Sequence, residues 1–437
     1  MKRAFVLTLA LCLLLLCACG QGVQPAARST GAETGGGDGT AILLQGDRAE
    51  ITGGGAKAEG STVTISAVGV YTLSGSLDGQ IVVDTGEDPV NVTLRLAGAE
   101  IRNPSGPALW VRQAKNVYLE LAEDSENLLS FGTEADLAAF DGSGEGAALY
   151  AEDDLQIEGG GRLQILGYGN NGITCKDDLE IQGGLLDVSA ANHGIRASES
   201  LLVTEGSLHI RAGGDAMKTT SADKDGKGWM KITGGELVLE AGSDGLSAET
   251  DLSIGGGTLS VTAQGEDTDR SHHALKAKGD VTVLGGELEL SSEGGDGVHC
   301  DGSFWLTGGS VRIRAADDGV QTGSKDSGLG DAQLTGGSLR ISAAHQAIKA
   351  AGQLCVSCDL LALAGTDKQA APADVGGPGV VLLGSKGSVG TEVSAEGGGT
   401  LTAAYDFKCI LFSAPELKVG DRVDITVGQT ETTVTAQ

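Results

Sequence analysis

Apolar and polar residues alternate in short runs along most of the chain, and the runs return at a regular interval. Residues 173–175, 179–181 and 186–190 each carry an apolar side chain at every second position. An equivalent set of three runs begins again at Ile195. A period of two over only a few residues indicates β-strands rather than helices. We therefore expect three short strands in each repeated unit.

Two further marks share this interval. A polar residue precedes a small and then an aliphatic residue once per unit, at Asn171, His193, Asp215, Asp244, His273, Asp296, Asp318 and Gln346, in steps of 22 to 29 residues. A second mark, a pair of glycines, ends at Gly161, Gly184, Gly235, Gly257, Gly286, Gly309 and Gly337, with Glu205-Gly206 filling the one gap. Two independent signals with one period are typical of repeat architecture. The glycines mark corners, where the backbone often needs a positive φ.

Three short strands cannot form a core within one unit, but each can pair with its counterpart one unit above and below. The sequence therefore predicts an all-β fold, a right-handed parallel β-helix with three short strands per rung. Its aliphatic interior column comprises Leu149, Ile173, Ile195, Met217, Leu246, Leu275, Val298, Val320 and Ile348. A column of small residues runs beside it, and because Cys175 and Cys300 fall in that column, we interpret them as buried hydrophobic residues rather than reactive thiols.

The two ends of the chain depart from the repeat. Lys2 and Arg3 precede an apolar stretch, too short to span a bilayer, that ends in Ala18-Cys19. This is the pattern of a bacterial lipoprotein signal, with Cys19 as the lipidated residue. We predict a signal peptide at 1–18, a flexible tether at 19–40, a parallel β-helix domain at 41–369 and a β-rich C-terminal cap at 370–437. The protein would then be a lipid-anchored monomer on the extracellular face of a bacterial, Gram-positive-type membrane.

Charge narrows the range of partners. The formal net charge is −29, which excludes nucleic acid as an expected partner because phosphate binding needs a surplus of Lys and Arg. So many carboxylates repel one another unless cations relieve them.

Several motifs together resemble a known family. They are Glu152-Asp-Asp-Leu155, Lys176-Asp-Asp-Leu-Glu-Ile181, the turn Ile232–Gly235, and the flanking segments Val68–Ile81 and Ile410–Leu417. The chain resembles the clostridial carbohydrate-binding parallel β-helix lipoproteins from about Ala41 to its C-terminus. The resemblance implies a fold akin to that of polysaccharide lyases, bound Ca²⁺, and binding of cellulose and pectic acid, without established catalysis.

Acidic residues gather at two corners of each rung. The candidate metal ligands are Asp153, Asp154, Asp177, Asp178, Asp215, Asp244, Asp296, Asp317 and Asp318. Rungs stack at about 4.8 Å, so their carboxylates repel one another unless something bridges them. Ca²⁺ suits such a site because it accepts many oxygen ligands in irregular geometry. The alternative is that these residues only form the turns and bond to local backbone.

A second set of candidates points outward between the two interior columns. The candidate ligand-binding residues are Trp110, Tyr150, Arg196, Lys218, Lys276, His299 and Lys349. Aromatic and cationic groups along a flat sheet suit an extended uronate chain. The alternative is a solvated face whose lysines pair with neighbouring aspartates.

The leading hypothesis is therefore an extracellular protein that captures acidic or plant cell-wall polysaccharide with the help of Ca²⁺. A pectate-type lyase is the second hypothesis, with Lys218, Lys276 or Lys349 as the base if burial lowers its pKa. The third is a structural surface spacer. No catalytic residue is assigned.

Overall fold

A computed structural model describes residues 39–87, 89–142, 146–222, 226–265, 272–323, 329–366 and 379–437. The predicted signal peptide and the tether up to Asp38 lie outside the described residues, as do the internal segments 223–225, 266–271 and 324–328. No helix in the described part has the length and apolar character needed to cross a membrane. The prediction of an all-β protein with many parallel strands is confirmed.

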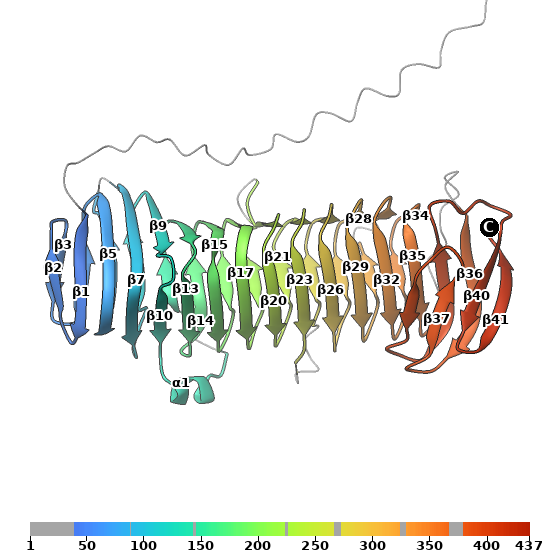
Figure 1. Ribbon diagram of the computed structural model, residues 1–437, viewed down its shortest axis with the longest axis horizontal. Helices are drawn as coiled ribbons and strands as arrows, with labels where there is room; N and C mark the ends of the chain where they lie inside the picture. Colours follow the sequence, from blue (N-terminus) through green and yellow to red (C-terminus); the bar gives the residue numbers. More distant parts are fainter. Residues whose placement is uncertain are drawn as a thin grey trace, which may run out of the picture. The chain divides into compact units, whose positions relative to one another are not determined.

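The strands pair with their counterparts one repeat later in three series, which are parallel except for the antiparallel pair within residues 56–65. Figure 1 shows the strands of successive turns side by side along the coil. The first series is a sheet of thirteen described strands. It comprises β3 (Ala56–Glu59), β4 (Thr62–Ile65), β6 (Gln80–Asp84), β8 (Leu109–Gln113), β11 (Ala147–Ala151), β14 (Asn171–Cys175), β16 (Ile195–Ala197), β18 (Met217–Thr219), β21 (Leu246–Ala248), β24 (Leu275–Ala277), β27 (Val298–Cys300), β30 (Val320–Thr322) and β33 (Ile348–Ala350).

The second and third series belong to one larger sheet. The second comprises β9 (Asn116–Leu121), β12 (Asp154–Gly159), β19 (Trp229–Ile232), β22 (Leu252–Ile254), β25 (Val281–Val283), β28 (Phe304–Leu306), β31 (Ala332–Leu334) and β34 (Leu354–Val356). The third comprises β10 (Glu126–Phe131), β13 (Arg162–Gly167), β20 (Glu236–Ala241), β23 (Thr258–Ala263), β26 (Glu287–Ser292), β29 (Ser310–Ala315), β32 (Ser338–Ala343) and β35 (Asp359–Ala364). Three long strands, β7 (Asn91–Asn103), β15 (Asp178–Ala190) and β17 (Ser200–Ala212), run through both series.

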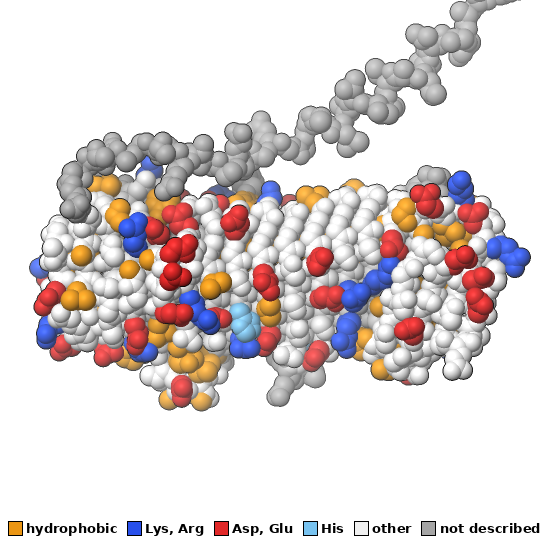
Figure 2. All heavy atoms as spheres, in the orientation of Figure 1, with side chains coloured by type: hydrophobic (Ala, Val, Ile, Leu, Met, Phe, Trp, Pro, Cys, Tyr) orange, Lys and Arg blue, Asp and Glu red, His pale blue; other side chains and the backbone are white. Residues whose placement is uncertain are grey.

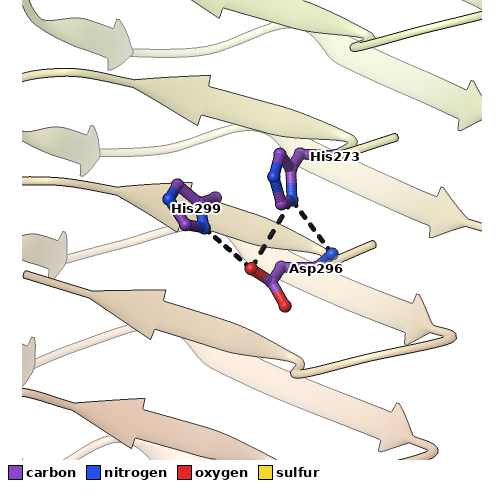
Figure 3. A group of neighbouring side chains, drawn as sticks. All are labelled: His273, Asp296 and His299. Carbon is purple, nitrogen blue, oxygen red and sulfur yellow. Dashed lines mark hydrogen bonds and ion pairs between the residues drawn. The ribbon is translucent and has the colours of Figure 1, made fainter. Parts of the chain in front are cut away.

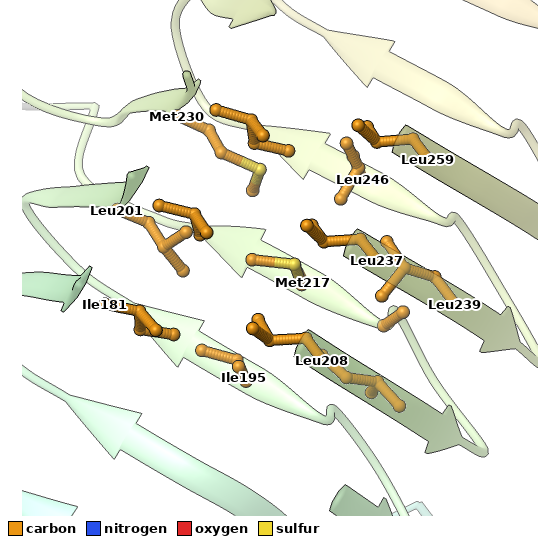
Figure 4. Close-up of a cluster of buried hydrophobic side chains, with 14 of the residues drawn as sticks. Ile181, Ile195, Leu201, Leu208, Met217, Met230, Leu237, Leu239, Leu246 and Leu259 are labelled. Atoms are coloured by element: carbon orange, nitrogen blue, oxygen red, sulfur yellow. The ribbon is translucent and has the colours of Figure 1, made fainter. Parts of the chain in front are cut away.

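The predicted interior columns are present in register. Ile173 pairs with Ile195, Ile195 with Met217, and Met217 with Leu246, and all four side chains are fully buried. Figure 4 shows Ile195, Met217 and Leu246 stacked between side chains of the second and third series. Cys175 and Cys300 lie in the column of small residues, and burial raises the pKa of each thiol to about 12. Such thiols are inert, as the sequence indicated.

The coil begins earlier in the chain than the clear repeats do. Val63 pairs with Ile81 and Ile81 with Leu109, so two turns of the first series precede the strand that contains Leu109. Before it, β1 (Thr40–Gly46) pairs in parallel with β5 (Gly69–Asp78) and antiparallel with β2 (Ala49–Thr52). The apolar residues of these turns are irregularly spaced, so the repeat pattern in the sequence did not predict them.

Antiparallel strands follow the last turn of the coil. They are β36 (Val380–Gly387), β37 (Glu392–Ala395), β38 (Thr400–Thr402), β39 (Phe407–Ser413), β40 (Arg422–Val427) and β41 (Thr430–Thr435). β39 pairs with β35 and covers Leu361 and Leu363, outward positions that hold Arg340 and Ser342 one turn earlier. The cap thus protects the open edge of the last turn, which a solenoid would otherwise expose.

One α-helix is described, α1 (Glu134–Ala139), in the insertion between β10 and β11. Thr133 caps its N-terminus in a capping box with Asp136, and none of its residues is buried. Despite this insertion, β10 and β11 keep their pairing with neighbouring turns.

The corner glycines generate a stability prediction. Gly257 has φ +89°, and a Cβ there would lie 2.8 Å from the carbonyl oxygen of Gly235 in the preceding turn. We expect Gly257→Ala to cost about 1–3 kcal/mol of unfolding free energy, because an alanine is strained at this φ. Urea unfolding measures the effect. Gly54→Ala is the control, since its Cβ would meet nothing within 4 Å; equal effects of the two variants would contradict the prediction.

Candidate functional site

The predicted outward column exists and is continuous. Each member pairs with the next in the first series: Trp110, Tyr150, Thr174, Arg196, Lys218, Ser247, Lys276, His299, Gln321 and Lys349. All seven residues predicted to bind ligand therefore lie in one line on one face of the coil.

The beginning of this column is aromatic and cationic. Trp110 and Tyr150 are half-buried neighbours on adjacent turns. The guanidinium of Arg112 lies 5.0 Å from the ring centre of Trp110, and the ammonium of Lys176 lies 5.7 Å from that of Tyr150. These distances are within the range of cation–π contact. Within the described residues Arg196, two turns on, has no ion pair.

A second line runs beside the column, through the polar residues that mark the repeat. We call it the polar ladder, and its members are Asn171, His193, Asp215, Asp244, His273, Asp296 and Asp318. Each side chain accepts a hydrogen bond from the backbone N–H of the marker residue one turn later, at 2.9–3.1 Å. Asp and Asn use Oδ1, and the two histidines use Nδ1. The ladder therefore satisfies a row of backbone donors that the corner would leave unpaired.

The outer oxygen of each ladder aspartate bonds a base of the column. Asp215 Oδ2 accepts from Lys218 at 2.7 Å, and Asp296 Oδ2 lies 2.8 Å from His299 Nδ1 within the same turn. Asp244 and Asp318 lack such a base in their own turn, where Ser247 and Gln321 stand. Their Oδ2 atoms instead accept from Lys276 and Lys349 of the following turn, each at 2.8 Å. Every ladder aspartate is thus matched by one base.

These contacts bear on both sets of candidates. With both carboxylate oxygens engaged, the four ladder aspartates offer little to a Ca²⁺ ion, and their calcium assignment stays a prediction. The geometry agrees with the alternatives that the sequence left open, backbone bonding for the aspartates and ion pairing for the lysines. The ladder aspartates are the neighbours with which these lysines pair.

Burial and pairing together set the pKa values along the ladder. Burial acts to raise the pKa of Asp215, but Lys218 and His193 outweigh it and the pKa is lowered. Burial raises the pKa of Asp244 and of Asp318 despite their lysines. Burial acts to lower the pKa of Lys349, but its bond to Asp318 raises it overall. The lyase hypothesis requires a base with a lowered pKa. The pKa of Lys349 is raised instead, so Lys349 does not meet this requirement.

Two histidines stack where the ladder meets the column. The rings of His273 and His299 lie 4.4 Å apart between centres, and both face Asp296 (Figure 3). Burial, with the nearby His299, lowers the pKa of His273 to about 3. Its neutral Nδ1 accepts the Asp296 N–H at 3.0 Å. Sequence analysis identified His273 only as a repeat mark. Because Asp, Asn and His occupy the same position in different repeats, that position could have been predicted to need a hydrogen-bond acceptor.

The remaining acidic candidates form two smaller groups. Carboxylate oxygens of Asp154, Asp177 and Asp178 lie within 4.8 Å of one another. Asp178 also pairs with Lys227 at 3.0 Å, a residue that the sequence did not single out. The other group joins Asp317 and Asp318 to His345, with His345 bonded to Asp317. Asp153 lies apart from both groups and accepts the backbone N–H of Ala114 at 2.8 Å.

Comparison with known proteins places these features in a family. Residues 59–319 match the model of the carbohydrate-binding domain-containing proteins, more than half of the chain. The chain belongs to this family. The match contains the polar ladder and all of the column except Gln321 and Lys349.

Two related proteins are similar over parts of their length. A carbohydrate-binding domain-containing protein of Acetivibrio thermocellus is 36% identical over 132 residues, 29% of this chain. The aligned part is 45% of that relative, so this chain matches less than half of it. A solved structure, described as the polysaccharide lyase-like protein from C. thermocellum in a gadolinium derivative, is 26% identical and has a TM-score of 0.47. That likeness covers 67% of this chain and 99% of the other.

The polar ladder generates a prediction about this family member's stability. Asp244→Ala would leave the buried N–H of His273 without its acceptor, which we expect to cost about 1–3 kcal/mol. Asp244→Asn should cost less, because Asn171 fills the same role elsewhere in the ladder. Urea unfolding compares the variants, with Asp301→Ala as an exposed acidic control. Equal costs for Asp244→Ala and Asp244→Asn would contradict the role of Oδ1.

His273 predicts a pH dependence. Its pKa is about 3 when folded and near 6.5 when unfolded, so the unfolded chain binds the proton more readily. Its contribution to stability is complete above pH 6.5 and is lost as pH falls toward 3. The slope is at most about 1.4 kcal/mol per pH unit. His273→Asn keeps an acceptor but cannot titrate, so its unfolding free energy should fall less between about pH 7.5 and about pH 5. Parallel curves for the two proteins would contradict this assignment.

Proposed function

We propose that this protein is an extracellular, lipid-anchored carbohydrate-binding protein that captures acidic or plant cell-wall polysaccharide such as polygalacturonate or cellulose. The observation that carries the proposal is the family match over residues 59–319, which contains the aromatic pair Trp110 and Tyr150 with its cations. Polysaccharide is then the partner, and the membrane is reached through lipid at Cys19, outside the described residues.

The proposed fold is a right-handed parallel β-helix with three short strands per turn. The in-register pairing of the three strand series supports it, and the handedness stays a prediction. In such a coil, outward side chains recur at about 4.8 Å along the face. A polysaccharide laid along that face would meet Trp110, Tyr150 and Arg196 in succession. The aromatic rings offer apolar faces to the sugars, and Lys176 and Arg196 offer charge to carboxylates. Arg112 already forms an ion pair with Asp84 at 3.3 Å.

Ca²⁺ is proposed as the assisting ion. Among the described groups, Asp154, Asp177 and Asp178 fit it best, because they bring carboxylate oxygens together outside the polar ladder. Burial raises the pKa of Asp154, and the charge of Asp178 adds to this effect, so a cation there would relieve both. The ammonium of Lys227 already supplies part of that relief to Asp178. When bound, Ca²⁺ would supply a bridge between protein and uronate carboxylates.

The lyase hypothesis receives less support from the residues. Lys218, Lys276 and Lys349 each donate to a ladder carboxylate, and the pKa of Lys349 is raised. A lysine held as ammonium is a poor base. We therefore favour binding over bond cleavage.

Retention on immobilised glycan tests the proposal. We expect the protein to be retained by polygalacturonate or cellulose, and retention by polygalacturonate to fall when a chelator replaces Ca²⁺. The double variant Trp110→Ala/Tyr150→Ala should weaken retention by polygalacturonate by about tenfold, as two aromatic contacts of about 0.5–1.5 kcal/mol each imply.

The matched control is Trp305→Ala, an exposed tryptophan in β28 of the second series. Failure to be retained by either polysaccharide would refute the proposal and favour the surface spacer. Absorbance from unsaturated sugar during incubation with polygalacturonate would show instead that the protein is a lyase.

A further inference from the structure

A groove of about 390 Å³ crosses the ends of successive strands of the third series. Its lining comes from the carboxyl ends of β13, β15, β17, β20 and β23, which pair in that order. Four steps between these five turns give a length of roughly 19 Å. A groove of this length suits an oligosaccharide rather than a single sugar. None of the outward column's residues lines it.

The floor and the walls differ in character. Small residues form the floor, including Ala190, Ala212 and Ala241, which follow one another in register and are almost fully buried. Tyr168 stands at one end, just beyond β13. Leu137 of α1, 42% exposed, forms a lip. Figure 2 shows hydrophobic side chains gathered at α1, beside charged ones on the same face. An aromatic ring beside a floor of small residues, which leaves room for a sugar ring, suits the flat face of a pyranose.

The polar groups of the groove are balanced in charge. Arg211 donates to Glu240 at 3.1 Å on the neighbouring turn. Ser189 and Gln264 add neutral donors and acceptors. A chain of uronates would meet Glu240 with no unpaired cation to compensate for it. Sugar hydroxyls, which both donate and accept, match a paired Arg and Glu together with an amide and a hydroxyl.

We propose that this groove is a second glycan site, and that it binds a neutral oligosaccharide laid across the five turns between Tyr168 and Gln264. The inference rests on the proposed function and adds that acidic and neutral glycans bind to two different surfaces. The cationic end of the outward column takes acidic chains, and the groove beside α1 takes neutral ones.

Calorimetric titration with two probes, cellohexaose and hexagalacturonate, tests the division. The purified protein should bind cellohexaose, and Tyr168→Ala should weaken that binding by about tenfold, as loss of an aromatic anchor of about 1–2 kcal/mol implies. Ala191→Trp should abolish it, because Ala191 is a half-exposed lining residue and a large ring there fills the groove. Thermal unfolding verifies that both variants fold. Trp305→Ala is the control that should leave cellohexaose binding unchanged.

The outcomes separate the two claims. If the protein binds neither probe nor either polysaccharide, the proposed function fails and the groove with it. If it binds cellohexaose but folded Tyr168→Ala and Ala191→Trp bind equally well, the groove inference fails and the function stands. If both variants lose hexagalacturonate as well, the assignment to neutral glycan is wrong. Loss of cellohexaose binding alone supports the inference.

Discussion

In-register stacking of parallel strands is the constraint on which the rest of this molecule depends. Each residue lies about 4.8 Å from its counterpart one turn later. In the interior this gives continuous aliphatic columns such as Ile173, Ile195 and Met217. On the surface the same rule places like residues against like, which is unfavourable wherever the repeated residue is charged.

The polar ladder resolves that conflict. One oxygen of each ladder aspartate is bonded to the backbone of the next turn, and the other is bonded to a Lys or His. Neutral His273 lies between Asp244 and Asp296 in the ladder, and its Nδ1 still accepts the hydrogen bond from the backbone N–H of Asp296. The Lys and His side chains that bond the ladder aspartates are engaged in this way, so we assign ligand binding to the aromatic end of the column and to the groove beside α1.

The sequence predicted the columns well because a solenoid converts spacing directly into contact. Period and alternation were enough to align Trp110 with Tyr150 and Lys276 with His299. They could not show which carboxylate oxygen is already bonded, since that depends on side-chain rotamers at the corner. The groove was missed for a different reason. Its floor consists of small residues at strand ends, and its lip comes from an insertion without periodicity, so neither carries a sequence signal.

The bonds from Asp244 to Lys276 and from Asp318 to Lys349 each join one turn to the next. Removing or copying a single turn at either place would leave one aspartate or lysine without its ion-pair partner. A change in the number of turns at these two places therefore keeps the charges paired only when both turns of a pair are gained or lost together. At these places the electrostatic repeat of the coil is a pair of turns, which is twice the length of its hydrophobic repeat.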